Sequence, residues 1–163
     1  MSTSAITVRR ARAGDLDPVN AVVSAAVRTW NLPQRVLRLA LPGYRYRVED
    51  LEHLHLLVAE NLRGEILGVA AWEEARPGER MEDRPTAWLH GLYVHPAHHH
   101  RGLGRRLLEA AHADLAQQGY QAVLVKAHKG ATGFFRHAGY LPLDGEETFP
   151  LRMGRTLAPP RPV

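Results

Sequence analysis

A basic loop with two closely spaced glycines, at residues 99–106, is the part of this sequence best suited to hold a ligand. An apolar run precedes the loop and an amphipathic segment follows it, so the loop is predicted to open a helix. The first turn of a helix leaves backbone N–H groups without internal partners, and the helix dipole favours an anion there. Gly102 and Gly104 carry no side chains that would keep a bulky diphosphate away from those amides. Arginines at positions 101, 105 and 106 add positive charge, so the loop is predicted to bind a diphosphate.

The elements around this loop follow from hydrophobic periodicity and from the glycines and prolines that interrupt it. Strands are expected at residues 6–9, 54–61, 66–73, 87–94 and 122–127, and helices at 15–27, 34–41, 102–118 and 131–137. Asp15 is expected to cap the first helix, and Pro42-Gly43 to end the second. Residues 44–53 fit either an extended loop or a helical turn, 75–85 fit a loop, and 140–143 with 148–153 fit a final hairpin.

This order of elements predicts an α/β protein with a mixed sheet and helices on both faces. The strand at 87–94, the helix at 102–118 and the strand at 122–127 would form a parallel, right-handed βαβ unit. A chain of 163 residues suits one domain. We expect that domain at residues 1–157, followed by a C-terminal tail at 158–163.

Two motifs resemble those of the GCN5-related N-acetyltransferase (GNAT) superfamily. His99-His100-Arg101-Gly102-Leu103-Gly104 is similar to the family's R/Q-x-x-G-x-G/A loop, and residues 131–140, ATGFFRHAGY, are similar to A-x-x-F-Y-x-x-x-G-F. The resemblance covers roughly residues 87–141. It implies the GNAT fold, a mixed and mostly antiparallel central sheet with a splayed parallel pair. It also implies acetyl-CoA as the cosubstrate.

The resemblance further implies which residues contact acetyl-CoA. The pyrophosphate would lie on the loop, and the pantetheine arm would pair with the backbone of the strand before it. The implied cofactor-binding residues are Leu92, Tyr93, Val94, His99, His100, Arg101, Gly102, Leu103, Gly104, Arg105, His128 and Phe135.

His90 is the candidate general base. It lies four residues before Val94, where some family members have a glutamate, and a histidine can accept a proton near neutral pH. The competing interpretation is a core histidine bonded to a backbone carbonyl. Glu73 and Glu74 are the alternative carboxylates, unless they form a solvated strand end. For the amine acceptor, the resemblance points to a wall formed by Trp30, Asn31, Tyr44, Tyr46 and the region after Glu73. The aromatic residues could equally be packing residues.

Three residues depart from the family pattern. His99 replaces the Arg or Gln that begins the loop, and His128 replaces an asparagine before the last helix. Phe135 replaces a tyrosine that protonates the leaving thiolate in many members. Phenylalanine has no proton to give, so we expect slower catalysis rather than none.

Composition excludes several other classes. The chain has no cysteine, which excludes a thiolate nucleophile and disulfides. Its 21 basic residues include only two lysines, and the arginines are scattered with a net charge of +4, so no nucleic-acid partner is expected. No run suits a signal peptide or a membrane span, so no membrane partner and a cytoplasmic location are expected. His95, His98, His99 and His100 lie too close in one loop for a metal site, and no metal is expected.

The sequence therefore predicts an acetyl-CoA-dependent N-acetyltransferase that acts on a primary amine, by direct attack in a ternary complex. The acceptor would be a small molecule or a peptide, and a homodimer is compatible with the sequence. The alternative is a non-catalytic acyl-CoA-binding sensor, to which the phenylalanine at position 135 lends weight.

Overall fold

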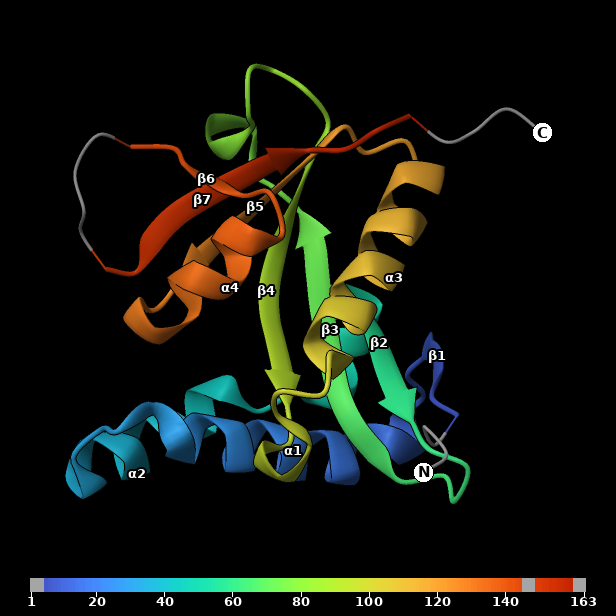
Figure 1. The fold of residues 1–163 in the computed structure, drawn as a ribbon, viewed down its shortest axis with the longest axis vertical. Helices are drawn as coiled ribbons and strands as arrows, with labels where there is room; N and C mark the ends of the chain where they lie inside the picture. The colour runs from blue at the N-terminus through green and yellow to red at the C-terminus, as the bar shows by residue number, and fades with distance from the viewer. Residues whose placement is uncertain (1–4, 145–148, 160–163) are drawn as a thin grey trace. The chain divides into compact units, whose positions relative to one another are not determined.

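The computed structural model describes residues 5–144 and 149–159, and within them the strands form one seven-stranded sheet (Figure 1). The strands follow the order β1-β2-β3-β4-β5-β7-β6. Their bounds are β1 Thr7–Arg10, β2 His55–Glu60, β3 Ile66–Glu74, β4 Thr86–Val94, β5 Ala122–Ala127, β6 Leu141–Pro142 and β7 Leu151–Thr156. The helices are α1 Leu16–Val27, α2 Gln34–Tyr44, α3 Leu103–Gln117 and α4 Thr132–His137. This mixed α/β sheet confirms the fold class expected from the sequence.

The chain folds as two compact units, the first made of residues 1–71 and 92–108 and the second of residues 72–91 and 109–163. The strands β3 and β4 and the helix α3 each run from one unit into the other.

In the first unit, helices cover both faces of β3. The apolar stripe of α1 is buried in one core with β2 and with Val69 of β3. On the opposite face, a Cβ atom at Gly68 would lie 3.3 Å from Leu107 of α3 and 3.2 Å from the carbonyl oxygen of Tyr93. Glycine at position 68 therefore lets both β4 and α3 approach the strand closely.

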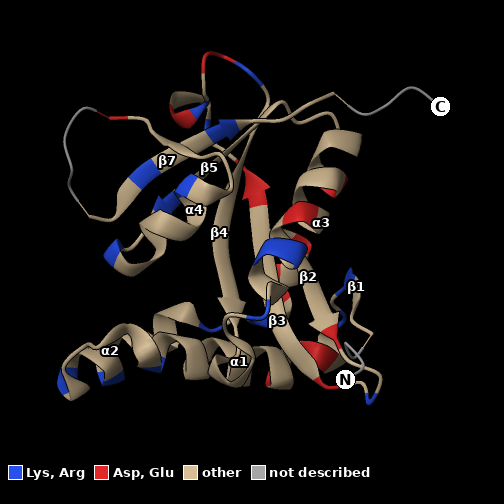
Figure 2. Cartoon of the chain, in the orientation of Figure 1, with Lys and Arg blue, Asp and Glu red and all other residues tan. Residues whose placement is uncertain are grey.

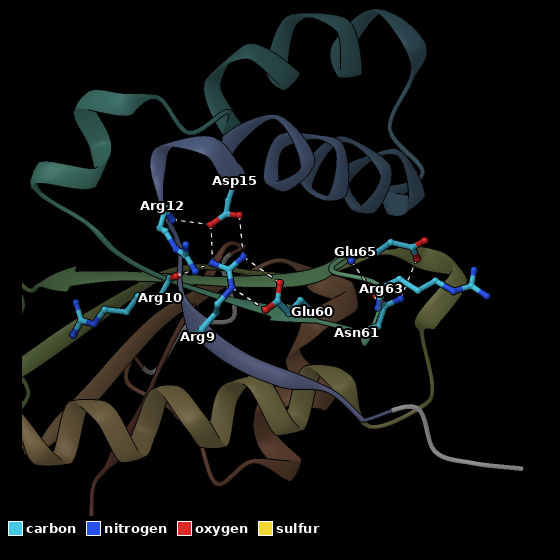
Figure 3. A network of polar contacts seen from close by, with 8 residues as sticks. All are labelled: Arg9, Arg10, Arg12, Asp15, Glu60, Asn61, Arg63 and Glu65. Carbon is cyan, nitrogen blue, oxygen red and sulfur yellow. Dashed lines mark hydrogen bonds and ion pairs between the residues drawn. The ribbon is translucent and has the colours of Figure 1, made fainter.

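A cluster of charged side chains holds β1, β2 and the start of α1 together (Figure 3). The Arg9 guanidinium donates hydrogen bonds of 2.8 and 3.0 Å to Asp15, and of 3.0 and 3.1 Å to Glu60. The hydrogen bonds from Arg9 lower the pKa of Asp15 from 3.8 to about 2, and they also lower the pKa of Glu60. The arginine thus serves as the shared partner of two carboxylates.

Asp15 occupies the N-cap position of α1, as expected, but its side chain does not cap the helix. Its carboxylate makes no hydrogen bond to the first turn of α1 and instead accepts one of 2.7 Å from the Arg12 amide. The reason is a 3-10 turn at Ala13–Asp15, which already places Asp15 in a helical conformation and directs its side chain back toward β1.

In the second unit, β5 lies between one parallel and one antiparallel neighbour. Its register with β4 runs from Thr86 opposite Ala122 to Leu89 opposite Val125. Both strands continue beyond this paired segment, β4 to Val94 and β5 to Ala127, while β7 pairs with β5 along its whole length. The short parallel register agrees with the expected separation of the pair at its carboxyl end.

The remaining differences from the expected elements are local. Helix α2 continues past Pro42 to Tyr44, because a proline in the last turn costs only one hydrogen bond. Residues 44–53 contain a 3-10 helix at Val48–Glu52, and the loop at 75–85 contains a 3-10 turn at Pro77–Glu79. The final hairpin is β6 with β7, and β7 starts later and extends further than expected. Residue 148 of that hairpin and residues 160–163 of the tail lie outside the described residues.

Candidate active site

The segment from β4 to α3 forms the predicted diphosphate loop. After β4 ends, the His95 amide donates to the Leu67 carbonyl oxygen at 2.9 Å, and Pro96–His98 form a 3-10 turn. The Arg106 amide makes the first helical hydrogen bond, to the Gly102 carbonyl oxygen. The amides between these two residues therefore point out of the N-terminal end of α3 and not toward a helical carbonyl. This arrangement suits an anion.

Gly102 is required by its backbone conformation. Its φ is +76°, a left-handed value that L side chains rarely adopt, and His100 has a φ of 62° close by. A Cβ atom at Gly102 would meet no atom within 4 Å, so the constraint is the backbone rather than space.

Two side chains of the loop, those of His99 and Arg106, make hydrogen bonds within the first unit. The ring nitrogen Nε2 of His99 donates to the Val94 carbonyl oxygen at 2.9 Å, since that oxygen can only accept. The Arg106 guanidinium donates to the Ile6 carbonyl oxygen, just before β1, at 2.6 Å. His99 thus ties the loop to the end of β4, and Arg106 is directed toward β1.

The side chain of Tyr93 belongs to an aromatic cluster of the first unit. Its ring stacks on Trp30 with centroids 6.3 Å apart, and Trp30 meets Tyr44 edge-on at 5.4 Å. Burial raises the pKa of Tyr93, which is 7% exposed. One of the predicted acceptor-wall residues, Trp30, therefore contacts the strand that precedes the loop, and a second, Tyr44, packs against Trp30.

The other two acceptor-wall residues differ in exposure, because Tyr46 is buried and Asn31 lies at the surface. Tyr46 is buried, and its backbone exchanges hydrogen bonds of 2.8 and 2.9 Å with the side-chain amide of Asn20, which indicates a structural role. Tyr46 and Asn20 both line a cavity of about 520 Å³, together with Asp17, Arg45 and Arg47. Asn31 is exposed and ends a 3-10 turn with a left-handed φ of 59°.

The segment of the chain that contains the four acceptor-wall residues carries a positive net charge. Residues 18–48 contain five arginines and no aspartate or glutamate. Helix α2 accordingly shows blue and no red in Figure 2.

In the second unit, the candidate base His90 lies beside Glu73. Its Nε2 is 3.1 Å from the Glu73 Oε1, and the two side chains are 25% and 32% exposed. Nε2 is buried, and its N–H direction does not align with the carboxylate, so the contact is electrostatic rather than a hydrogen bond. The sequence singled out both residues but did not show that they meet across two strands.

Three further residues join this group, and sequence reasoning missed all of them. The Trp88 ring stacks on His90 with centroids 3.9 Å apart, and the Lys126 ammonium lies 4.7 Å from the centre of the Trp88 ring. Lys126 also pairs with Glu79 at 3.5 Å. The sequence feature that could have pointed to this group is Lys126, a charged residue within the otherwise apolar strand 122–127.

His128 and Phe135 lie at the other end of β5 and in α4. The His128 ring accepts a hydrogen bond of 3.2 Å from the Gly130 amide, and burial lowers its pKa. Phe135 is 5% exposed, with the rings of Phe134 and Tyr140 each at 5.2 Å. Both residues thus have local packing roles, and their contacts with a cofactor stay predictions.

Residues 5–144 and 149–159 contain no group of three or more His, Cys, Asp or Glu side chains arranged to hold a metal ion. They also contain no helix long and apolar enough to cross a membrane.

Comparison with known proteins identifies the family. The model of the acetyltransferase (GNAT) family matches residues 24–140, more than half of the chain. No curated protein matches the sequence closely enough to count as a relative. The chain belongs to the acetyltransferase (GNAT) family, which confirms the family and the enzyme class expected from the sequence.

Solved structures share the fold at low sequence identity. The PaiA N-acetyltransferase from Thermoplasma acidophilum, in complex with coenzyme A, is 16% identical, with a TM-score of 0.76 over 93% of this chain and 99% of that one. A GNAT family acetyltransferase from Brucella melitensis, in complex with acetyl-CoA, is 20% identical, with a TM-score of 0.69 over 98% and 92%. A GCN5-related N-acetyltransferase from Rhodopseudomonas palustris is 20% identical, with a TM-score of 0.73 over 96% and 99%.

Proposed function

We propose that the protein transfers an acetyl group from acetyl-CoA to a primary amine, by direct attack in a ternary complex. The observation that carries this proposal is the turn from β4 into α3, where Gly102 and the first amides of the helix are arranged as an anion would require. Membership of the GNAT family supports it. So do two similar structures that are complexes with coenzyme A and acetyl-CoA.

The chain's own groups would bind the two ends of the cosubstrate. The residues at 99–105 would hold the pyrophosphate, mainly through backbone amides, and the backbone of Leu92, Tyr93 and Val94 would pair with the pantetheine arm. We assign His128 and Phe135 to the neighbourhood of the pantetheine and the sulfur on the resemblance alone.

His90 is the proposed base for the acceptor amine. Acetyl-CoA supplies an activated thioester, but an alkylammonium cannot attack it until a proton is lost. Because Nε2 of His90 lies 3.1 Å from a carboxylate oxygen of Glu73, we propose that the negative charge keeps the proton of the neutral ring on Nε2 without a hydrogen bond, and that Nδ1 accepts the proton of the amine. Glu73 then stabilises the imidazolium, so we propose it as the positioning residue.

The leaving thiolate has no side-chain acid at position 135. A thiol with a pKa of about 8.5 is a tolerable leaving group without one, and water would protonate the thiolate. The proposal is therefore compatible with Phe135.

An acceptor screen that follows CoA release tests the proposal. It covers amines, amino acids, peptides and polyamines, and it includes amines that carry a carboxylate because residues 18–48 have five arginines and no acidic residue. We expect turnover with at least one class, and a strong loss of kcat in the His90→Gln variant. CoA binding without turnover on any acceptor would overturn the proposal.

The phenylalanine at position 135 favours one second candidate, a non-catalytic acyl-CoA sensor. Such a protein would bind acetyl-CoA tightly and release no CoA in the same screen. In that case the His90→Gln variant should bind acetyl-CoA as tightly as the wild type, and neither protein should release CoA.

A further inference from the structure

We propose that the cavity between the start of α1 and the segment after α2 binds an organic anion that also carries a hydrogen-bond donor. The anionic group would be a carboxylate or a phosphate. Every lining residue of the cavity falls between positions 13 and 48, so the site lies within the first compact unit. None of them belongs to β4, to the turn that follows it or to α3, so this site is separate from the one proposed for acetyl-CoA.

The cavity has the dimensions and the apolar surface of a small-molecule site. Its volume is about 520 Å³, within the range of about 300–1,000 Å³ that is usual for ligand pockets. Leu16, Pro42 and Val48 supply apolar lining that can cover the hydrocarbon part of a ligand.

The base of the cavity is held in place before any ligand binds. The Asn20 side chain accepts a hydrogen bond of 2.8 Å from the Tyr46 amide and donates one of 2.9 Å to the Tyr46 carbonyl oxygen. Both residues are buried. These two bonds tie the segment after α2 to α1, so the two walls of the cavity are already in position. A preformed site loses less entropy on binding than one that must be ordered first.

Two arginines line the wall formed by the segment after α2. Arg45 and Arg47 have extended backbone conformations, in which successive side chains point to opposite sides. Tyr46 lies between them and is buried in the core, so the two exposed arginines share the other side. Neither of their side chains forms an ion pair with a residue that the structure describes. Two such guanidinium groups favour a carboxylate or a phosphate as their partner.

One acidic residue, Asp17, lines the wall formed by α1. It lies three residues before Asn20, so the two side chains share one side of the helix. Within residues 5–144 and 149–159, the Asp17 carboxylate has no ion-pair partner. An ionised carboxylate accepts hydrogen bonds and repels other anions. The ligand is therefore expected to place its anionic group near the arginines and a hydroxyl or amide donor near Asp17.

NMR titration of the full chain with 4-hydroxyphenylacetate tests this site, because an apolar ring joins the carboxylate and the hydroxyl of this probe. We expect a dissociation constant of about 1–10 mM, which suits a ligand of this size. Phenylacetate lacks the hydroxyl and should bind about two- to tenfold more weakly. The uncharged 4-hydroxyphenylacetamide should bind at least about tenfold more weakly. In a parallel titration with 4-hydroxyphenyl phosphate, the tighter of the two anions identifies the preferred anionic group.

Matched variants locate the bound probe. Arg45→Gln and Arg47→Gln should each weaken binding by at least about tenfold. Arg38→Gln is the control, since Arg38 is an exposed arginine of α2 that does not line the cavity, and it should leave binding unchanged. Asp17→Ala should remove the preference for 4-hydroxyphenylacetate over phenylacetate. The four side chains are exposed, so none of these changes should lower Tm appreciably.

Three results would overturn the inference. The first is an equal loss of affinity in Arg38→Gln, because binding would then follow the general charge of the segment. The second is displacement of the probe by excess CoA, because the probe would then occupy the turn proposed for the cosubstrate. The third is the absence of saturable binding by both the carboxylate and the phosphate probe up to about 50 mM. Acetyl transfer is measured separately by CoA release, so failure of this site leaves the proposed function untouched.

Discussion

Replacing Gly102 with alanine tests whether the backbone of the loop, rather than its charge, holds the cosubstrate. The φ of +76° places the residue in the left-handed region, where a non-glycine residue costs about 1–2 kcal/mol. No atom lies within 4 Å of the added Cβ, so no steric clash adds to this cost. Relief of the strain would rotate the peptide that opens α3 and redirect its first amides.

Gly119, at the other end of α3, is the matched control. Its φ is +93°, and a Cβ atom there would also meet nothing within 4 Å. Gly102→Ala and Gly119→Ala should therefore each lower the free energy of unfolding by about 1–2 kcal/mol, which for a chain of this size lowers Tm by about 2–8 °C.

The two variants should differ in CoA binding. Calorimetric titration with CoA should give a dissociation constant at least about tenfold higher for Gly102→Ala, a loss of about 1.4 kcal/mol, and an unchanged one for Gly119→Ala. If both variants lose stability and neither loses affinity, the amides at this turn do not bind the cosubstrate. If both lose affinity equally, the effect is one of general stability.

The remaining predictions concern the base, the leaving group and the charged cluster of the first unit. Glu73→Gln should lower kcat, with KM for acetyl-CoA unchanged, because it removes the charge beside the proposed base; an unchanged kcat would remove Glu73 from the mechanism. Phe135→Tyr should raise kcat if departure of the thiolate limits the rate. A lower Tm without faster turnover would instead mean that the added hydroxyl is buried without a partner, at a cost of about 1–3 kcal/mol. Because the folded-state pKa of Asp15 is lowered to about 2, its pairing with Arg9 stabilises the protein above pH 3.8 and is lost as the pH falls toward 2. Asp15→Asn should therefore cost about 1 kcal/mol at pH 7 after allowance for solvent screening, and the gap from the wild type should close by about pH 2 in urea titrations; a gap that stays constant with pH would contradict this assignment.

The local features of the fold were predictable because their causes are local. The glycine pair, the apolar strand before it and the amphipathic stripe after it all lie within about 30 residues, so the sequence predicts the turn from β4 into α3. The helix of residues 34–41 was also expected, and only the place of Pro42 in its last turn differed.

Contacts between distant segments were not predictable in the same way. Arg9 and Glu60 are 51 residues apart and meet only because β1 pairs with β2 in one register. The same is true of Glu73 beside His90, which depends on how neighbouring strands align. Asp15 was correctly expected at the N-cap position of α1, but its ion pair with Arg9 could not be predicted, because no local pattern reveals the position of Arg9.

The hydrogen bond from Arg106 to the Ile6 carbonyl joins the first turn of α3 to a segment 100 residues earlier in the chain. This contact has a practical consequence for anyone who shortens the protein or attaches a tag. Removing the chain through Ile6 would delete the acceptor of that bond and release one side of the helix end on which the cosubstrate is proposed to bind. A truncated form would therefore show weak CoA binding for a reason unrelated to its binding residues.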